Sequence, residues 1–512
     1  MVPLHRRSGR RRMLAATVGM ALAAAVAVLP GAASASAADS TVAADGPLLS
    51  YVVNTKVDHG TVKSVERAIS RAGGQVVISY EKIGVIVVHS ANPGFAAAIR
   101  KAHGVQTAGA TRTAAIAPAS TTELGAPERL TAAQVAAATA ANAKAGTEQE
   151  PLEANQWDLV AIKADKAAKI NPGSRKVTVG VIDTGIDDTH PDLAANFSAS
   201  QSANCVGGVA DTTPGAWRPY DPASDYHGTH VAGEIAAARN GIGVAGVAPN
   251  VKVAAIKVSD PVTSLFYPES VVCAFVFAAD HGISVTNNSY YIDPWLYNCL
   301  DDPDQRAIVD AVNRASKYSE RKGVLNVASA GNSNDDLDSN ALSDASSPDD
   351  GTPVDRTVDP HKCFDIPTQL PGVVTVSATG VQNLKSYYSS YGRGVIDVAA
   401  PGGDKYQIPG TPDKNGRILA TLPGNTYGYL QGTSMASPHV AAVAALIKSR
   451  HPHATPEQIQ WLLKAEADNP GCPTGLYDPD GNGVQDATCT GPKRLNSFYG
   501  YGIVDALDAV TK

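Results

Sequence analysis

Near-continuous apolar runs separated by helix-length segments place the tightest limit on how this chain folds. After residue 150 they occupy positions 177–182, 251–258, 283–287, 324–328 and 373–378. Strands of this composition are buried on both faces, and the intervening segments are long enough for helical crossovers. The pattern predicts an α/β fold with a buried, mostly parallel sheet over residues 151–512.

A smaller unit precedes that sheet, at residues 47–115. Strand-like runs at 48–54, 76–80, 85–89 and 105–110 alternate with helical segments that begin near Val62 and Phe95. The order β-α-β-β-α-β predicts a small α+β, ferredoxin-like domain. Residues 116–150 are rich in Ala, Thr and Glu, which is typical of a linker or a loosely helical spacer.

The first 37 residues have the pattern of an export signal. A basic stretch from Arg6 to Arg12 precedes an uncharged apolar run at 13–29, and Ala35-Ser36-Ala37 resembles a cleavage site. A retained membrane anchor is the alternative, but the small residues after Pro30 favour removal. No later run reaches the roughly 18 apolar residues of a membrane span, so we expect a secreted, extracellular product without a membrane partner.

Charge and cysteine usage agree with this location. The net charge of −7 over 512 residues argues against a nucleic-acid partner. The six cysteines all follow residue 200: Cys205, Cys273, Cys299, Cys363, Cys472 and Cys489. An even number in an exported chain predicts three disulfides, with Cys472–Cys489 the favoured pair because it flanks a short Gly- and Asp-rich loop. Buried free thiols are the alternative.

A serine stands at the start of one predicted helix. The motif is Gly432-Thr433-Ser434-Met435-Ala436-Ser437-Pro438-His439, and the apolar positions that follow it have helical spacing. Ser434 therefore lies at the positive end of a helix dipole, where developing negative charge is favoured. A lone serine in this position is most often an N-cap, and it becomes a candidate nucleophile only if a base and an acid accompany it.

Three other segments supply those groups. Asp183 ends the first apolar run, His227 opens the segment His-Gly-Thr-His-Val-Ala-Gly, and Asn332 follows the run at 324–328. Alone, each has a structural interpretation as a turn aspartate, a core histidine or a loop asparagine. His227 and His230 also have a spacing used by metal ligands, but no third ligand accompanies them, so a metal site is not favoured.

Together, in the order Asp, His, Asn, Ser, the four segments resemble the subtilisin-like serine proteases. The resemblance covers residues 151–512 and implies a three-layer α/β fold. Residues 47–115 resemble the propeptide inhibitor domain of the same family. The implied protein is a monomeric secreted serine endopeptidase, made as a zymogen and matured within residues 116–150. Its partners would be protein or peptide substrates and its own propeptide, and catalysis would need no cofactor.

The resemblance also assigns roles. Ser434 is the nucleophile, His227 the base, Asp183 the residue that orients the imidazole, and Asn332 an oxyanion donor. Ser289, Tyr290, Tyr291 and Gly331 are expected to bind substrate. Tyr291 stands where the family usually has a pocket-lining glycine. It either narrows or reshapes the primary specificity pocket, or points outward and changes little.

A structural calcium site is implied by the same resemblance. Side-chain oxygens of Asp192 and Asn240 would join the carbonyls of Ala238, Ile242 and Val244, and Glu153 would approach from the N-terminal arm. A metal-free turn is the alternative.

A second loop, Asp478-Pro479-Asp480-Gly481-Asn482-Gly483, opens like an EF-hand. Its twelfth position is Cys489 instead of Glu, which favours a surface turn over a metal site.

Two rival functions use the same fold. One is a catalytically silent binding protein, and the other is a structural protein whose motifs serve packing only. Chemically competent residues at the four motif positions argue against both.

Overall fold

The computed structural model describes residues 46–113, 125–146 and 148–512. The predicted signal peptide at 1–37 lies outside the described residues, as do residues 116–124 of the predicted linker. Within the described ranges, no helix is long and apolar enough to cross a membrane.

A seven-stranded sheet forms the centre of the larger part of the chain. Its spatial order is β16 (Val398–Pro401), β15 (Val374–Thr379), β11 (Leu325–Ser329), β9 (Val285–Asn288), β6 (Thr178–Asp183), β8 (Lys252–Lys257) and β7 (Ala203–Asn204). Every neighbouring pair is parallel. The five predicted apolar runs are all strands of this sheet, and the two short edge strands were not predicted.

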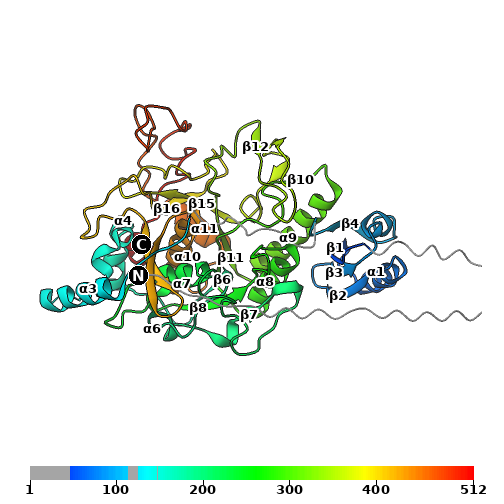
Figure 1. Ribbon diagram of the computed structural model, residues 1–512, viewed down its shortest axis with the longest axis horizontal. Helices are drawn as coiled ribbons and strands as arrows, with labels where there is room; N and C mark the ends of the chain where they lie inside the picture. The colour runs from blue at the N-terminus through cyan, green and yellow to red at the C-terminus, as the bar shows by residue number, and fades with distance from the viewer. Residues whose placement is uncertain (1–45, 114–124, 147) are drawn as a thin grey trace, which may run out of the picture. The chain divides into compact units, whose positions relative to one another are not determined.

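Helices cover both faces of the sheet (Figure 1). One apolar cluster joins residues of α7 (His227–Ala236) and α10 (Thr433–Arg450) to Val253 and Ala255 of β8. The other joins α8 (Pro268–Asp280) and α9 (Pro303–Arg321) to Ala254 and Ile256 of the same strand. Successive side chains of a strand point to opposite faces, so one strand contributes to two cores. This is the predicted three-layer α/β fold.

The strand order reverses at β6. The chain passes from β6 to β8 on one side of it and later returns to β9 on the other. In open parallel sheets the crevice at such a reversal, outside the carboxyl ends of the strands, is where ligands bind. Asp183 is the last residue of β6 and stands at this crevice.

The N-terminal unit has the predicted order of elements. They are β1 (Leu49–Thr55), α1 (His59–Arg71), β2 (Gln75–Tyr80), β3 (Val85–Ser90), α2 (Phe95–Ile99) and β4 (Val105–Ala110). The strands form an antiparallel sheet in the order β2-β3-β1-β4. An apolar cluster that includes Tyr51, Val65 and Phe95 packs between this sheet and its helices.

The described part of the predicted linker contains regular structure. β5 (Glu128–Arg129) adds to the antiparallel pair β17 (Ile418–Leu422) and β18 (Thr426–Leu430). α3 (Ala132–Ala145) follows, with a capping box between Thr131 and Gln134 and a left-handed Gly146 at its end. None of its side chains is fully buried, so it is the helical form of the predicted spacer.

Smaller elements complete the fold. The helices are α4 (Trp157–Ala161), α5 (Ala164–Ile170), α6 (Pro191–Ala194), α11 (Pro456–Ala465) and α12 (Ala506–Thr511). Two short antiparallel pairs join β10 (Asn298–Cys299) to β14 (Cys363–Phe364) and β12 (Leu342–Asp344) to β13 (Arg356–Val358).

The six cysteines form three disulfides, Cys205–Cys273, Cys299–Cys363 and Cys472–Cys489. The predicted number and the favoured pair are both confirmed.

Candidate active site

The carboxyl end of β6 meets the start of α7 through a buried pair. Nδ1 of His227 lies 2.8 Å from Oδ1 and 3.0 Å from Oδ2 of Asp183, and both side chains are shielded from solvent. The Thr184 N–H donates to Asp183 Oδ1 at 2.7 Å. A carboxylate on Nδ1 holds that nitrogen protonated and leaves the Nε2 lone pair as the basic site.

Close approach of the helix to the strand depends on Gly228. A Cβ at this position would lie 2.4 Å from the carbonyl oxygen of Gly185 and 3.1 Å from Asp183 Oδ1. Real Cβ atoms do not approach backbone oxygen so closely, so a larger residue would push α7 away. The glycine after the histidine therefore sets the Asp183–His227 geometry.

Ser434 is the second residue of α10 and is fixed to the segment after β9. Pro438 has no N–H, so the Ser434 carbonyl loses its usual partner four residues on. The Ser289 hydroxyl donates to that carbonyl at 2.9 Å, while Ser434 Oγ donates to the Ser289 carbonyl at 3.2 Å. The proline of the motif thus creates the acceptor that fastens the helix start to the neighbouring strand end.

Asn332 follows β11 and is oriented by the residue before the serine. Its Oδ1 accepts from the Thr433 N–H and from Thr433 Oγ1, both at 2.9 Å. Gly331 N–H donates to Thr433 Oγ1 at 3.2 Å. Because the amide oxygen is committed to Thr433, the two N–H donors form the opposite edge of the amide.

The four predicted catalytic residues therefore come from strand ends and helix starts that are hydrogen-bonded in pairs. Asp183 is joined to His227, Ser434 to the end of β9, and Asn332 to the start of α10. A hydroxyl, an imidazole, a carboxylate and an amide donor in such an arrangement can carry out acyl transfer.

The predicted substrate-binding residues divide into two groups. Ser289 is buried, and its hydroxyl donates to the Ser434 carbonyl. Tyr290 is also buried, stacks on Phe266 at 4.9 Å between ring centroids, and donates its hydroxyl proton to Asn288. Tyr291 and Gly331 are the two that remain partly exposed.

Tyr291 is held by an acidic loop. Its hydroxyl donates to Asp349 Oδ2 at 2.5 Å. Asp349 in turn contacts the buried Asp293. Burial raises the pKa of Asp293 well above its usual range, and the charge of Asp349 adds to that shift. The phenol is thus attached to the segment between β12 and β13, which no sequence motif singled out.

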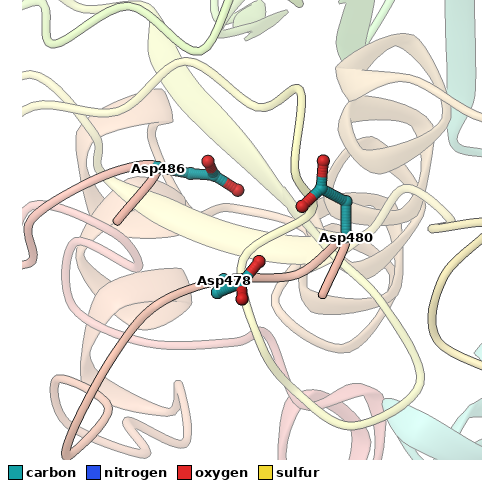
Figure 2. A group of neighbouring side chains, drawn as sticks. All are labelled: Asp478, Asp480 and Asp486. Atoms are coloured by element: carbon teal, nitrogen blue, oxygen red, sulfur yellow. The ribbon is translucent and has the colours of Figure 1, made fainter. Parts of the chain in front are cut away.

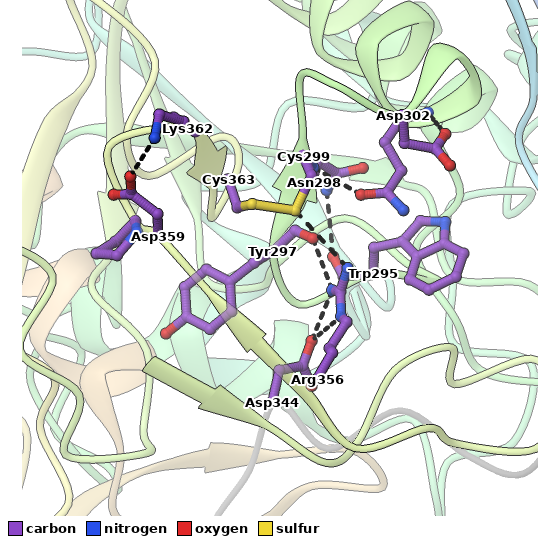
Figure 3. The surroundings of a disulfide bond; sticks show 12 residues. Trp295, Tyr297, Asn298, Cys299, Asp302, Asp344, Arg356, Asp359, Lys362 and Cys363 are labelled. Carbon is purple, nitrogen blue, oxygen red and sulfur yellow. Dashed lines mark hydrogen bonds and ion pairs between the residues drawn. A yellow bond between two sulfur atoms is a disulfide. The ribbon is translucent and has the colours of Figure 1, made fainter. Parts of the chain in front are cut away.

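A disulfide lies next to one end of that segment (Figure 3), where Arg356 Nη1 is 3.9 Å from Cys299 Sγ. Cys299 and Cys363 face each other across the β10–β14 pair. Nearby, the Arg356 guanidinium binds Asp344 Oδ2 at 2.6 Å and donates to the Tyr297 carbonyl at 2.7 Å. The loop that carries Asp349 is therefore fixed at both ends.

The residues predicted to hold calcium lie together. The Val244 N–H donates to Asp192 Oδ2 at 3.1 Å, and Asn240 Nδ2 lies 3.4 Å from Asp192 Oδ1. Burial raises the pKa of Asp192 to about 6. Glu153, which was expected to approach this site, forms an ion pair with Arg239 of the same loop and accepts from the Glu150 N–H.

Glu150 is an additional candidate that the sequence did not indicate. Its Oε2 is buried without a hydrogen-bond partner among the described residues. Burial raises the pKa of Glu150, and repulsion from Asp192 adds to the shift. An orphaned carboxylate oxygen beside Asp192 and a loop with carbonyl donors fits a hard cation.

The acidic loop near the C-terminus is different. Carboxylate oxygens of Asp478, Asp480 and Asp486 lie within 4.8 Å of one another (Figure 2). Asp478 already accepts from the N–H groups of Gly481, Asn482 and Gly483. The carboxylate therefore closes its own turn, which agrees with the favoured interpretation of a surface turn.

His230 lies in a buried polar network. Its Nδ1 is 2.9 Å from Glu234 Oε1, and its Nε2 is 3.1 Å from the Gly428 carbonyl oxygen. Both ring nitrogens have protein partners, so its spacing from His227 reflects packing.

Known proteins are similar to this chain in sequence and in fold. The sequence pattern of the subtilase family matches residues 174–502. Subtilisin BL of Lederbergia lenta is 34% identical over 334 residues, which cover 65% of this chain and 96% of that protein.

Two solved structures share the fold. The epidermin leader peptide processing serine protease of Staphylococcus aureus superposes with a TM-score of 0.61 at 22% identity, covering 90% of this chain and 98% of its own. Fervidolysin of Fervidobacterium pennivorans gives 0.60 at 24% identity, covering 91% and 61%.

The fold and these relatives define a serine endopeptidase, a hydrolase that acts on peptide bonds. More specifically, the chain belongs to the subtilase family. This family membership argues against the two rival functions, a purely structural protein and a catalytically silent binding protein.

Proposed function

We propose that the chain is a secreted zymogen whose mature part cleaves peptide bonds through Asp183, His227 and Ser434. Ser434 Oγ attacks the scissile carbonyl, and His227 Nε2 takes its proton and passes it to the leaving amine. Water then hydrolyses the acyl-enzyme by the same proton transfers in reverse. The buried Asp183–His227 hydrogen bond carries this proposal, because it is what makes the imidazole a directed base.

The oxyanion of the tetrahedral intermediate would be stabilised by two donors. One is the Asn332 amide, whose oxygen is committed to Thr433. The other is the Ser434 N–H in the first turn of α10, where the helix dipole also favours negative charge.

A Ser434→Ala variant of the full chain tests the proposed function. It should lose peptide hydrolysis and should remain at full length, because no nucleophile is left for self-processing. Ser449→Ala is a matched control, since it removes a hydroxyl from the other end of α10. A Ser434→Ala enzyme that still matures and cleaves peptides would refute the assignment.

Contacts of the N-terminal unit support its role as an intramolecular inhibitor. Its sheet lies on α9, where Asn54 Nδ2 donates to the Ala307 carbonyl at 2.9 Å and Thr107 donates to Asp310 at 2.8 Å. Arg100 also forms an ion pair with Asp304.

The end of the unit reaches the loop that contacts Tyr291. Thr113 donates through both its N–H and its hydroxyl to Asp350, at 2.7 and 2.5 Å. Asp350 is adjacent to Asp349, the partner of the Tyr291 hydroxyl. The last described residue of the unit, Thr113, thus lies beside the loop that contacts Tyr291, which supports the role of an inhibitory propeptide. N-terminal sequencing of the mature product should give a start within residues 116–150.

Secretion is supported by the signal-like first 37 residues and by three disulfides, which persist in oxidising compartments. The proposed substrates are proteins or peptides, and the proposed state is a monomer.

A structural calcium ion is the second proposal for this fold. Asp192, Asn240 and Glu150 would hold it with the carbonyls of Ala238, Ile242 and Val244. The ion would neutralise buried carboxylates and so stabilise the folded state. It has no part in the acyl-transfer steps.

Thermal unfolding of the Ser434→Ala chain, which cannot digest itself, tests this site. Removal of calcium with EDTA should lower the Tm by about 5 °C, the effect of losing an ion present well above its Kd. Asp192→Asn should abolish the EDTA effect, whereas Asp478→Asn in the other acidic loop should preserve it. An unchanged Tm with EDTA would exclude a stabilising calcium ion.

A further inference from the structure

One buried carboxylate, that of Asp365, lies between the segment that carries Tyr291 and the end of β11. Asp365 follows β14, and the next residue, Ile366, accepts a hydrogen bond from the Ile292 N–H at 3.0 Å. The hydroxyl of Thr368, three residues after Asp365, donates to the Ser329 carbonyl at 2.7 Å. The short segment 365–368 therefore connects the chain after Tyr291 to the end of β11.

The Asp365 side chain points towards Gly331. Its Oδ2 lies 3.5 Å from where a Cβ on Gly331 would stand, so the absence of a side chain on Gly331 leaves the carboxylate facing the segment that leads to Asn332. Asp365 is only 3% exposed, and its Oδ1 has no hydrogen-bond partner among the described residues. A buried acceptor left unpaired carries a substantial desolvation penalty.

The surroundings of Asp365 offer it no positive charge. None of the ion pairs found in the described ranges includes it. Burial raises its pKa well above the usual range, and the nearby Asp335 adds to the shift. Burial also raises the pKa of Asp335, to about 6, and that carboxylate accepts from the Tyr297 hydroxyl at 2.6 Å.

We propose that Asp365 determines substrate specificity and selects a lysine or arginine immediately before the scissile bond. This inference rests on the proposed function. A peptide whose carbonyl lies at Ser434 and Asn332 directs the adjoining side chain between the chain at Tyr291 and Gly331. A long side chain entering there ends at the Asp365 carboxylate, where a terminal cation would add to its hydrogen bond with Thr368 and give the unpaired Oδ1 a partner.

Apolar side chains are disfavoured by the same geometry. They would cover Asp365 without pairing it, and a site built around a buried polar group rejects ligands that leave that group unsatisfied. The specificity of this enzyme should therefore differ from the preference for large apolar residues that the family resemblance suggests.

The test uses mature wild-type enzyme and peptide p-nitroanilides that differ only in the residue before the anilide. Arg and Lys substrates should exceed the Phe and Leu substrates in kcat/KM by about 100-fold, the scale of a charge-assisted hydrogen bond. A preference for Phe or Leu would overturn the proposal, and this measurement requires no variant to fold.

Asp365→Asn sharpens the result. Its volume is close to that of aspartate, and it should lose the preference for Arg and Lys while keeping or gaining activity on Phe. Asp338→Asn is the matched control, because Asp338 is an exposed carboxylate of a nearby loop. A preference for Arg and Lys that survives in Asp365→Asn would contradict the role of this residue.

Failure of the specificity proposal can be told apart from failure of the proposed function. An enzyme that cleaves the Phe substrate best, and is inactivated by a serine-directed phosphonate, keeps the function and loses the specificity assignment. An enzyme that cleaves none of the substrates and is not labelled loses both.

A second pair of carboxylates, Glu269 and Asp260, surrounds Arg112 of the N-terminal unit. The Arg112 guanidinium lies 3.6 Å from the centroid of the Tyr267 ring and pairs with Glu269 at 3.2 Å and Asp260 at 3.4 Å. The Glu269 side chain is fully buried, and its Oε2 has no hydrogen-bond partner in the described part of the chain.

We infer that this site binds a basic side chain of the substrate, further from the scissile bond, once the propeptide has left. Removal of Arg112 leaves a buried carboxylate, a second carboxylate and an aromatic face. These are the groups that recognise a guanidinium by charge and by cation–π contact.

An arginine scan tests this second site. In substrates with Arg before the anilide, Arg is placed in turn at each of the next five upstream positions. One position should raise kcat/KM about 10-fold over Ala in the wild type. Glu269→Gln should lose that gain, while the exposed Glu457→Gln control keeps it. No favoured position, or a gain that persists in Glu269→Gln, would refute the site.

Discussion

The four segments proposed to be catalytic and the stretch between β12 and Asp365 are specified by the sequence in different ways. Asp183, His227, Asn332 and Ser434 each lie within a short motif at a strand end or a helix start. Asp349 and Asp365 lie in a long irregular stretch, held by the Cys299–Cys363 disulfide and the Arg356–Asp344 ion pair. On these proposals, local sequence determines the residues of the reaction, whereas contacts between distant residues determine the substrate preference.

Asn332→Ala should have the largest effect and should act on every substrate alike. Loss of an oxyanion donor lowers kcat by about 10²–10³-fold, a magnitude established for a subtilisin. Because this donor acts on the scissile carbonyl, the ratio of Arg to Phe substrates should not change. Steady-state kinetics on both substrates checks this.

If the ratio of Arg to Phe substrates changed in Asn332→Ala together with the rate, the account that separates catalysis from specificity would be contradicted. Asn334→Ala is a suitable control, because Asn334 lies two residues on and instead accepts from Lys385.

Removal of the Cys299–Cys363 disulfide should lower both stability and selectivity. The paired Cys299→Ser and Cys363→Ser variant opens a loop of 64 residues, which should cost about 2–4 kcal/mol in the free energy of unfolding. Asp365 follows Cys363 by two residues, so the Arg-to-Phe ratio should also fall. Denaturant unfolding and kinetics measure the two effects.

The Cys472–Cys489 pair is the internal comparison for that prediction. It spans 17 residues around the acidic surface turn, so its removal should reduce stability less and leave the Arg-to-Phe ratio unchanged. An equal loss of selectivity in both variants would show that the effect arises from general loosening.

His439 offers the smallest effect, on stability alone. It closes the serine motif but is buried, with Nε2 3.1 Å from Asp158 and Nδ1 3.3 Å from Glu234. Burial opposes its charge, yet these two carboxylates raise the pKa of His439 to about 10. The imidazolium therefore stabilises the fold fully below pH ~6.5, and this contribution is lost as the pH rises through about 10.

Unfolding of the Ser434→Ala chain between pH 6 and 10 should show this loss as a free energy of unfolding that falls steadily as the pH rises. His439→Gln should be less stable at pH 6 and should show a flatter pH profile. A profile with the same slope in both chains would contradict an imidazolium at this position.

The parts of the molecule that were predicted share a local cause. The sheet was predicted because strands buried on both faces are apolar throughout, and the N-terminal unit because its period changes from strand to helix and back. The short edge strands β7 and β16 were missed because brief segments carry little periodic signal.

Some predicted site residues have side-chain partners far along the chain, which no local motif indicates. Tyr290 is in the core because Phe266 offers it a stacking partner, and Glu153 forms an ion pair with Arg239. The sequence did not indicate Asp365, because its position depends on Gly331, which is 34 positions before it, and on the Cys299–Cys363 disulfide.

Covalent labelling of the mature enzyme by a serine-directed phosphonate tests the central claim most directly. We predict one adduct per molecule, located by peptide mass spectrometry on Ser434, with activity lost in proportion to labelling. Ser434→Ala should take up no label. An active enzyme that resists the reagent, or an adduct on a different residue such as Ser437, would contradict the assignment of Ser434 as the nucleophile.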